Sequence, residues 1–322
     1  MRTLIEALKW RRAAGAAALS ILLALGLVQL PVVHAVEKGS TSAPQRIVSI
    51  NLCTDQLVAE LVPEDRIAAL SRLAADPVLS AVAGRISGIR LVRGTAEEVL
   101  SLQPDLVLTT RYSTPEVVAL LRRLGVRVVF IDMASDLDGI RKAIRKVSEV
   151  TGSQDKGESL IADFDRRIAA AAPRSPYRPT ALAYHINSLT SGPGGLMDAA
   201  LIAAGFRNAA ASRNLGPAGR LPLETFVAHP PDLVVLAHDP AAFRTVTADN
   251  LRHSAFRDLL NRRRHVHVPM PLWLCGTPEL ATAIEQLGRE RAALVRAAVQ
   301  RRGLEGPGHA DFSMTSGSGS PQ

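Results

Sequence analysis

A helix that ends at a proline and is followed by an apolar run occurs twice in this chain. The segment EEVLSLQPDLVLTTRY starts at Glu97, and ETFVAHPPDLVVLAHD starts at Glu224. Aligned on these glutamates, the two segments share a Pro-Asp step at Pro104 and Pro231. A proline stops a helix, and the apolar run after it is typical of a buried strand. The repeat therefore predicts two related α/β lobes in one chain.

Short apolar runs and helical patterns alternate along the rest of the chain. The runs predicted as strands are 46–50, 66–71, 105–110, 126–132, 178–186, 232–238 and 265–270. The predicted helices are 51–62, 94–103, 115–125, 195–205, 224–230, 255–261 and 278–302. Such alternation favours parallel sheets with helices on both faces. Thr95, with Glu98 three residues later, predicts a capping box at the start of its helix.

Two long helical patterns separate the two sets of strands. They cover Leu137–Val150 and Gln154–Ala172, and Gly152 divides them. The domains expected are an N-terminal lobe at 46–136, a helical segment at 137–176 and a C-terminal lobe at 177–302. A linker at 36–45 precedes them, and a tail at 303–322, rich in Gly and Ser, is expected to be disordered.

Residues 1–35 have the features of a secretory signal peptide. A basic start, an apolar run over 13–33 and the small residues Val33 and Ala35 follow the expected order. The alternative is a membrane anchor, since the run approaches the length of a span. Neither Cys53 nor Cys275 lies near the cleavage site, so an unlipidated periplasmic protein is expected. The formal charge of +8 includes no basic stripe interleaved with aromatics, and nucleic acid is not an expected partner.

From Arg46 to Arg301 the chain resembles the class III solute-binding proteins of ABC importers, the family for vitamin B12, iron–siderophores and haem. The resemblance rests on the order and spacing of RIVSINLCTDQLVAEL, AEEVLSLQPDLVLTT, GLMDAALIAAGFRNAA and LETFVAHPPDLVVL. It implies two Rossmann-like lobes joined by a single long helix, here Gln154–Ala172, with a ligand cleft between them. A stiff bridge of this kind implies only a small tilt of the lobes when ligand enters.

The resemblance also implies a role for the repeated glutamate. In the family, one glutamate on each lobe docks into arginine pockets of a two-fold symmetric permease, and Glu97 and Glu224 hold the matching positions. Arg–carboxylate pairs are directional, so they would fix orientation as well as affinity. The alternative is that both glutamates only complement a helix dipole.

Ligands of open α/β sheets bind beyond the carboxyl ends of the strands. The residues that follow the predicted strands are therefore the candidate cleft wall. We expect ligand contacts from Asn51, Cys53, Thr54, Arg111, Tyr112, Asp132, His185, His238, Trp273 and Cys275. Leu52, Met133, Asn187 and Leu272 belong to the same candidate wall, and Arg220, just before the second glutamate motif, could also reach into the cleft.

This mixed wall suits a bulky ligand with a flat or apolar body and acidic edges, such as a metal chelate or corrinoid. Trp273 could stack on a macrocycle or simply pack in the protein. Arg111 could pair with ligand carboxylates or be a solvated loop residue. Cys53 and Cys275 have three interpretations: buried apolar side chains, a disulfide across the cleft, or ligands of a soft metal or of the bound molecule.

The expected function is capture of an iron–siderophore, cobalamin or related chelate and its delivery to an ABC permease dimer, by a monomer without a cofactor or metal of its own. One alternative is a bare zinc- or manganese-binding protein, although the first lobe offers only Asp55 and Asp132 as clear ligands. The other is a periplasmic chelatase-like enzyme. The chain contains no G-x-S-x-G, H-E-x-x-H or phosphate-binding glycine loop, and an enzyme is not expected.

Overall fold

The computed structural model describes residues 42–237 and 249–304. The chain divides into a unit of residues 1–42 and a unit of residues 43–322, and the elements below belong to the second. The predicted signal peptide, most of the linker at 36–45, His238 and residues 305–322 of the tail lie outside the described residues. Among those that are described, no helix has the length and apolar character needed to cross a membrane.

The first lobe is built on a parallel sheet with the strand order β3-β2-β1-β4-β5. Its strands are β1 (Ile47–Ser49), β2 (Ile67–Ser71), β3 (Leu91–Val92), β4 (Leu106–Thr109) and β5 (Val128–Phe130). The connecting helices include α2 (Leu52–Leu61), α3 (Ala96–Ser101) and α4 (Pro115–Arg123). All of these except the two-residue β3 were predicted, because their apolar runs are long enough to show a period.

The second lobe has a mixed sheet with the order β11-β10-β6-β7-β9, and β8 also pairs with β6. Its strands are β6 (Thr180–Tyr184), β7 (Leu189–Thr190), β8 (Arg207–Asn208), β9 (Gly219–Arg220), β10 (Leu233–Leu236) and β11 (Arg264–His267). Its helices are α7 (Leu196–Ala203), α8 (Leu223–Ala228), α9 (Asp249–Arg252) and α10 (Ser254–Arg262). The neighbouring strands β11, β10 and β6 are parallel, as predicted.

The prediction of a parallel second sheet was wrong at one edge, where β7 runs antiparallel to β6 and β9. Only Ile186–Ser188 lie between His185 at the end of β6 and the start of β7. A parallel crossover needs a dozen or more residues, so a connection this short must turn back. Asn187 and Ser188 make the turn with φ of 58° and 57°.

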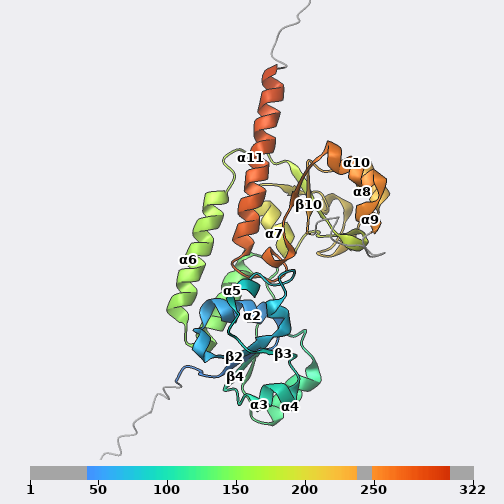
Figure 1. Cartoon of the computed structure of the whole chain (residues 1–322). Coiled ribbons are helices and arrows are strands. Elements are labelled where there is room, and N and C mark those ends of the chain that lie inside the picture. The colour runs from blue at the N-terminus through green and yellow to red at the C-terminus, as the bar shows by residue number, and fades with distance from the viewer. Residues whose placement is uncertain (1–41, 238–248, 305–322) are drawn as a thin grey trace, which may run out of the picture. The chain divides into compact units, whose positions relative to one another are not determined.

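Two long helices connect the lobes in sequence. They are α5 (Leu137–Thr151) and α6 (Gln154–Ala171), and Gly152 ends α5 at φ +71°, where a side chain would be strained. The predicted pair of helices is confirmed. Figure 1 shows α6 running beside α11 (Leu280–Leu304), which continues two residues into the predicted tail. The Arg167 guanidinium binds Glu285 of α11 at 2.8 Å.

The aspartate of the repeated Pro-Asp step makes equivalent hydrogen bonds in both lobes. The Asp105 carboxylate accepts hydrogen bonds from the backbone N–H groups of Gln45 (2.6 Å) and Arg46 (3.1 Å), just before β1. The Asp232 carboxylate accepts from the N–H of Thr180 (2.7 Å) and from its hydroxyl (2.8 Å), at the first residue of β6. In each sheet these two strands are neighbours. The shared aspartate therefore holds the start of the adjacent strand.

The predicted capping box is only half formed. The Thr95 hydroxyl accepts from the N–H of Glu98 at 3.3 Å, as expected. The Glu98 carboxylate does not return to Thr95 but accepts from the backbone N–H (2.7 Å) and the Nε (2.9 Å) of Arg93. A guanidinium is a stronger partner for a carboxylate than a neutral amide, and Arg93 lies close enough to take it.

Candidate ligand-binding site

A cavity of about 370 Å³ lies at the carboxyl edge of the first sheet. Segments that follow β1, β2, β3 and β4 line it, with Val117 of α4: Ile50, Asn51, Ser71, Arg72, Leu73, Val92, Arg93, Gly94, Tyr112, Ser113 and Thr114. We call it the first-lobe cavity. Two predicted wall residues, Asn51 and Tyr112, belong to it. Arg72, Leu73 and Arg93 were missed, although Arg72 directly follows a predicted strand and the same rule would have found it.

The exposed side chains of the first-lobe cavity are aromatic, aliphatic and cationic. Tyr112 is 75% exposed and Leu73 is 49% exposed, which is unusual for such apolar groups. Arg93 is held by the Glu98 carboxylate at 2.9 Å. The hydrogen bonds from Arg93 lower the pKa of Glu98, and the charge of Arg72 contributes to the same shift. Glu98 neutralises Arg93, so the net positive charge beside this apolar surface comes from Arg72.

Asn51 and Thr54 have different surroundings, although both lie at the start of α2. The Asn51 carboxamide oxygen accepts from the N–H of Cys53 at 3.0 Å and caps the helix, and its side chain is partly exposed. Thr54 is wholly buried. Its hydroxyl donates to the Asn51 carbonyl at 2.9 Å and lies 2.7 Å from the Ser49 hydroxyl. Internal hydrogen bonds therefore hold the Thr54 side chain inside the lobe in this structure, and its contact with ligand stays a prediction.

Arg111 and Asp132 are brought together from the ends of β4 and β5. A guanidinium nitrogen of Arg111 lies 3.3 Å from the Asp132 carboxylate. Both side chains are largely exposed, at 73% and 90%. An exposed pair of this kind contributes little to stability, and water screens it. Both residues are therefore accessible, and their contact with ligand stays a prediction.

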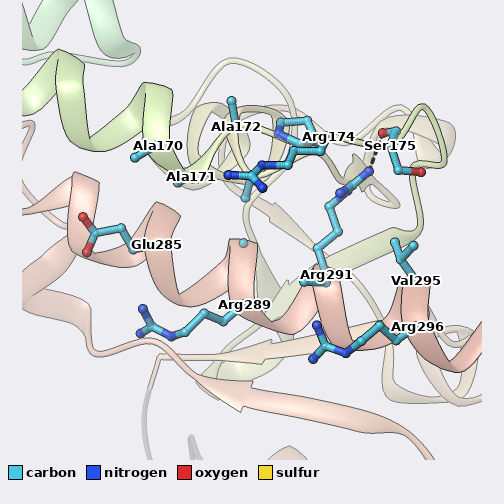
Figure 2. Close-up of a pocket in the computed structure, with 14 residues that line it drawn as sticks. Ala170, Ala171, Ala172, Arg174, Ser175, Glu285, Arg289, Arg291, Val295 and Arg296 are labelled. Atoms are coloured by element: carbon cyan, nitrogen blue, oxygen red, sulfur yellow. Dashed lines mark hydrogen bonds between the residues drawn. The ribbon is translucent and has the colours of Figure 1, made fainter.

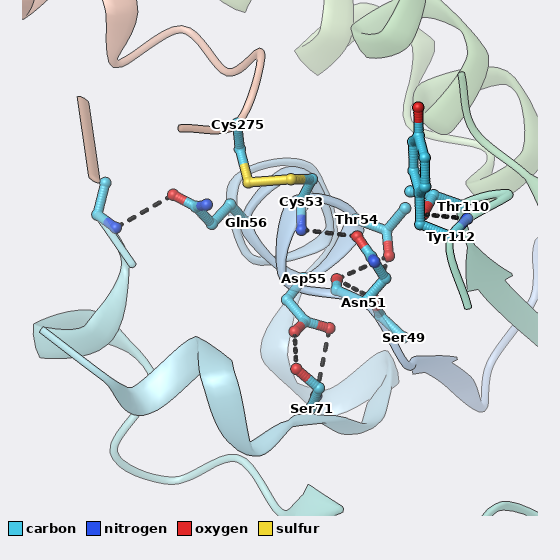
Figure 3. Close-up of a disulfide and its surroundings, with 11 residues drawn as sticks. Ser49, Asn51, Cys53, Thr54, Asp55, Gln56, Ser71, Thr110, Tyr112 and Cys275 are labelled. Carbon is cyan, nitrogen blue, oxygen red and sulfur yellow. Dashed lines mark hydrogen bonds between the residues drawn. A yellow bond between two sulfur atoms is a disulfide. The ribbon is translucent and has the colours of Figure 1, made fainter. Parts of the chain in front are cut away.

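The two cysteines form a disulfide (Figure 3), with their Cα atoms 5.1 Å apart and 222 residues between them in sequence. Cys53 lies in the first turn of α2, at the carboxyl edge of the first sheet. Cys275 lies between the short 3-10 helix Met270–Leu272 and α11, beyond the carboxyl end of β11. Of the three interpretations the disulfide is confirmed, and those that require free thiols are wrong. Cys275 is also fully buried, so its side chain does not face a ligand.

The loop of Cys275 approaches the first lobe closely at Gly276. A Cβ added to Gly276 would lie 2.3 Å from the Cβ of Ala134, so only glycine fits there without a shift. A cavity of only about 10 Å³ remains beside the disulfide, with Cys53, Thr110, Met133 and Gly276 among its lining residues. The carboxyl edges of the two sheets are therefore in direct contact at this point.

His185 and Trp273 stack in the second lobe. Their ring centroids are 5.2 Å apart, with an interplanar angle of 24°. His185 is buried, and its Nε2 lies 3.3 Å from the Ser191 hydroxyl. The Trp273 indole N–H donates to the Val268 carbonyl at 3.2 Å. Trp273 packs on His185 but is only partly buried, and stacking on a ligand stays a prediction.

Asn187 and Arg220 form a further polar pair on the second lobe. A guanidinium nitrogen of Arg220 donates to the backbone carbonyl of Asn187 at 3.1 Å and to its side-chain oxygen at 2.8 Å. Both residues are exposed. The bonds hold Asn187 in its left-handed conformation at the turn after β6.

Asp55 is the most strongly perturbed acid described. It is wholly buried in α2, and burial raises its pKa to about 7. Hydrogen bonds from the Ser71 hydroxyl and N–H oppose that shift. This carboxyl group is enclosed inside the first lobe, which removes it as a metal ligand in the cleft. Within residues 42–237 and 249–304, no three His, Cys, Asp or Glu side chains gather as a metal site.

Glu97 and Glu224 occupy equivalent and accessible positions. Each is the second residue of a six-residue helix, α3 or α8, and each is exposed. Neither carboxylate has a hydrogen bond or an ion pair with another described residue. Both side chains are therefore available to a partner, and both also lie where a helix dipole favours negative charge.

The chain is similar in sequence to known proteins of one family. The family model described as periplasmic binding protein matches residues 47–256. The chain therefore belongs to the periplasmic binding protein family. A cobalamin-binding protein of Halobacterium salinarum is 29% identical over 199 residues, which cover 60% of this chain and 54% of that protein. The chain thus matches about half the length of this relative.

Solved structures with the same fold include two periplasmic proteins. One is the haem-binding protein RhuT from Roseiflexus sp. RS-1 in apo form, with a TM-score of 0.61 and 24% identity, covering 76% of this chain and 96% of that chain. The other is the vitamin B12-binding protein BtuF of Vibrio cholerae, with a TM-score of 0.60 and 18% identity, covering 78% of this chain and 98% of that chain. At these identities the likeness shows the two-lobed α/β fold.

Proposed function

We propose that this protein is the substrate-binding component of an ABC importer, which captures a metal chelate and delivers it to a permease dimer in the inner membrane. The proposed ligands are a cobalamin, a haem or an iron–siderophore. Membership of the periplasmic binding protein family and the ligands named for its relatives, cobalamin and haem, support this proposal. We also propose that residues 1–35 direct export and that the mature, unlipidated monomer works in the periplasm.

The observation that carries the proposal is the composition of the first-lobe cavity. Tyr112 and Leu73 present exposed apolar surface at the carboxyl edge of a parallel sheet, where ligands of such folds bind. Arg72 places positive charge on the same wall, where Arg93 is paired with Glu98. A flat, largely apolar chelate with carboxylate or phosphate groups at its edge matches both features. A small hydrophilic ion would leave the aromatic and aliphatic surface in water.

Direct titration tests the proposal. The chain from Val36 onward contains one tryptophan, Trp273, which lies two residues from Cys275. Its fluorescence should be quenched in a saturable way by haemin, by cobalamin or by a ferric hydroxamate, with a Kd in the micromolar range or below. Native mass spectrometry of the same mixtures should show a one-to-one complex. Absence of saturable binding to all three ligands would reject the proposal.

Export has its own test. Expression of the full chain in a bacterium with an outer membrane should place the protein in the periplasmic fraction, with a mature N-terminus at Val36. A protein that stays in the membrane fraction and retains residues 1–35 would instead show that this segment is an anchor.

A further inference from the structure

A second cavity, of about 660 Å³, lies between the end of α6, the segment that follows it and one side of α11 (Figure 2). It shares no lining residue with the first-lobe cavity. Its apolar part consists of small side chains, including Ala170, Ala171, Ala292 and Val295. Its charged part consists of Arg174, Arg289, Arg291 and Arg296, with Glu285 as the one lining acid. We call this cavity the arginine groove.

Glu285 does not neutralise these arginines, because another residue already binds it. Arg167, which does not line the groove, donates from Nε to one Glu285 oxygen at 2.8 Å and from Nη2 to the other at 3.1 Å. This two-point contact holds the carboxylate and lowers the pKa of Glu285, and the charge of the groove residue Arg289 contributes to the same shift. Both carboxylate oxygens therefore face a guanidinium from α6, and the groove keeps a positive balance.

Arg291 is a buried cation that has only neutral acceptors. Arg291 is only 5% exposed to solvent. Nε donates to the Gly205 carbonyl at 3.1 Å, and Nη2 donates to the carbonyls of Ser175 and Tyr177, both at 2.6 Å. Nη1 donates no hydrogen bond to the described part of the chain. Burial, together with the nearby charge of Arg178, lowers the pKa of the Arg291 guanidinium, because no carboxylate offsets the cost of removing this charge from water.

The other three arginines of the groove are accessible. Arg174, Arg289 and Arg296 are exposed, and none forms an ion pair or a side-chain hydrogen bond within the described residues. Figure 2 shows Arg174 on the side of the groove near Ser175, and Arg289 and Arg296 along α11. Like charges gathered around one cavity repel each other, and a bound anion would relieve that repulsion.

We propose that the arginine groove binds a phosphate group carried on a partly apolar molecule. Guanidinium groups present paired N–H donors that match phosphate oxygens, and several of them can share one phosphate. The alanine and valine side chains of the groove would contact the apolar part of the same molecule. Two sources have this chemistry, a soluble phosphate compound and the headgroup of an anionic phospholipid.

The test uses the mature chain and two probes, each at constant ionic strength. Inorganic pyrophosphate in calorimetry represents the soluble source. Co-sedimentation with phosphatidylcholine vesicles, with and without phosphatidylglycerol, represents the lipid source. The groove variant is Arg174→Gln/Arg289→Gln/Arg296→Gln, which spares the structural Arg291. The matched control is Arg90→Gln/Arg123→Gln/Arg127→Gln, which removes three exposed arginines of the first lobe and the same net charge.

We expect saturable binding of at least one probe, weakened about tenfold or more by the groove variant and retained by the control. Which probe binds identifies the source. Saturable binding of neither probe, or equal weakening in both variants, would overturn the proposal. The chelate affinity of the groove variant should equal that of the wild type. The outcome of this test is therefore independent of the proposed import function.

Discussion

Cys53 and Cys275 join the carboxyl edges of the two sheets by a covalent bond, although 222 residues separate them in sequence. Cys53 lies in the first turn of α2, and Cys275 lies beyond the carboxyl end of β11. The bond and the tight contact at Gly276 tie the second lobe to α2 of the first lobe. The loop that carries Trp273 and Cys275 is thus held against the first lobe by a covalent bond as well as by packing.

Removal of the disulfide should destabilise the protein strongly. The double variant Cys53→Ala/Cys275→Ala should lose about 2 to 5 kcal/mol of unfolding free energy, because a long loop is no longer constrained in the unfolded chain. Urea unfolding followed by circular dichroism measures the change. Wild-type protein treated with a reductant should shift to the same midpoint as the variant. Equal stability of oxidised and reduced wild type would contradict the bond.

The contribution of Asp55 to stability should fall as pH rises from about 4 to about 7. The pKa of Asp55 is raised from 3.8 to about 7 in the folded state, so folding takes up a proton throughout this window. The stability associated with that proton is fully present below pH 3.8 and is lost as pH passes the folded pKa. The decline amounts to roughly 4 kcal/mol at about 1.4 kcal/mol per pKa unit.

Asp55→Asn should flatten this pH dependence, because the amide does not titrate. Asp65→Asn, at an exposed position in the same lobe, should leave it unchanged. Denaturant unfolding at pH 4, 5.5, 7 and 8 provides the comparison. Wild-type and Asp55→Asn curves that run parallel across the window would show that the carboxyl group is not buried as described.

Tyr112 should contribute directly to chelate affinity. Its ring is 75% exposed in the first-lobe cavity, and a flat ligand would bury it. Tyr112→Ala should weaken binding about tenfold by Trp273 quenching, with little effect on unfolding. Tyr177→Ala removes another exposed tyrosine, outside the cavity, and should leave affinity unchanged. If the two variants behave alike, the ligand does not contact this wall.

Glu97 and Glu224 should affect transport without affecting ligand binding. Glu97→Ala/Glu224→Ala should reduce association with the permease about tenfold or more, because two charge-assisted contacts are lost. Pull-down with reconstituted permease and a separate titration of the chelate measure the two properties.

Glu116 allows the helix-dipole alternative to be separated from docking. It is also exposed and is also the second residue of its helix, α4. If the glutamates act only on helix dipoles, Glu116→Ala should resemble the other substitutions in stability, and transport should respond to none of them.

Gly276 should tolerate no side chain. Gly276→Ala places a Cβ 2.3 Å from that of Ala134, so the loop that carries Cys275 must shift. We expect a loss of about 1 to 3 kcal/mol in unfolding free energy. Ala134→Gly in the same chain should restore part of it, since the clashing methyl group is removed. No recovery would place the strain elsewhere.

Local patterns were sufficient for most of the fold. The strands β1, β2, β4, β5, β6, β10 and β11, and all the helices except the four-residue α9, follow from apolar periodicity and from Pro and Gly signals in the sequence. Strands of two residues, such as β3 and β9, carry no period and were missed. The antiparallel edge was missed for the same reason, because the short return after His185 has no apolar pattern of its own.

The candidate site was predicted by position but not by orientation. The rule that ligands bind at carboxyl strand ends led to Asn51 and Tyr112, which line the first-lobe cavity. It could not show that Thr54, three residues beyond Asn51, turns inward to Ser49, because rotamers and hydrogen bonds depend on the packed environment.

The amino-acid sequence alone determined the α/β class, the two related lobes and the paired glutamates, because short-range periodicity and the internal repeat encode them. The tertiary structure decided which of three interpretations of Cys53 and Cys275 holds, how deeply Asp55 is buried and that four arginines from α11 and the segment after α6 surround one cavity. These properties depend on distances between residues far apart in the chain, and such distances are set by the packing of the whole fold.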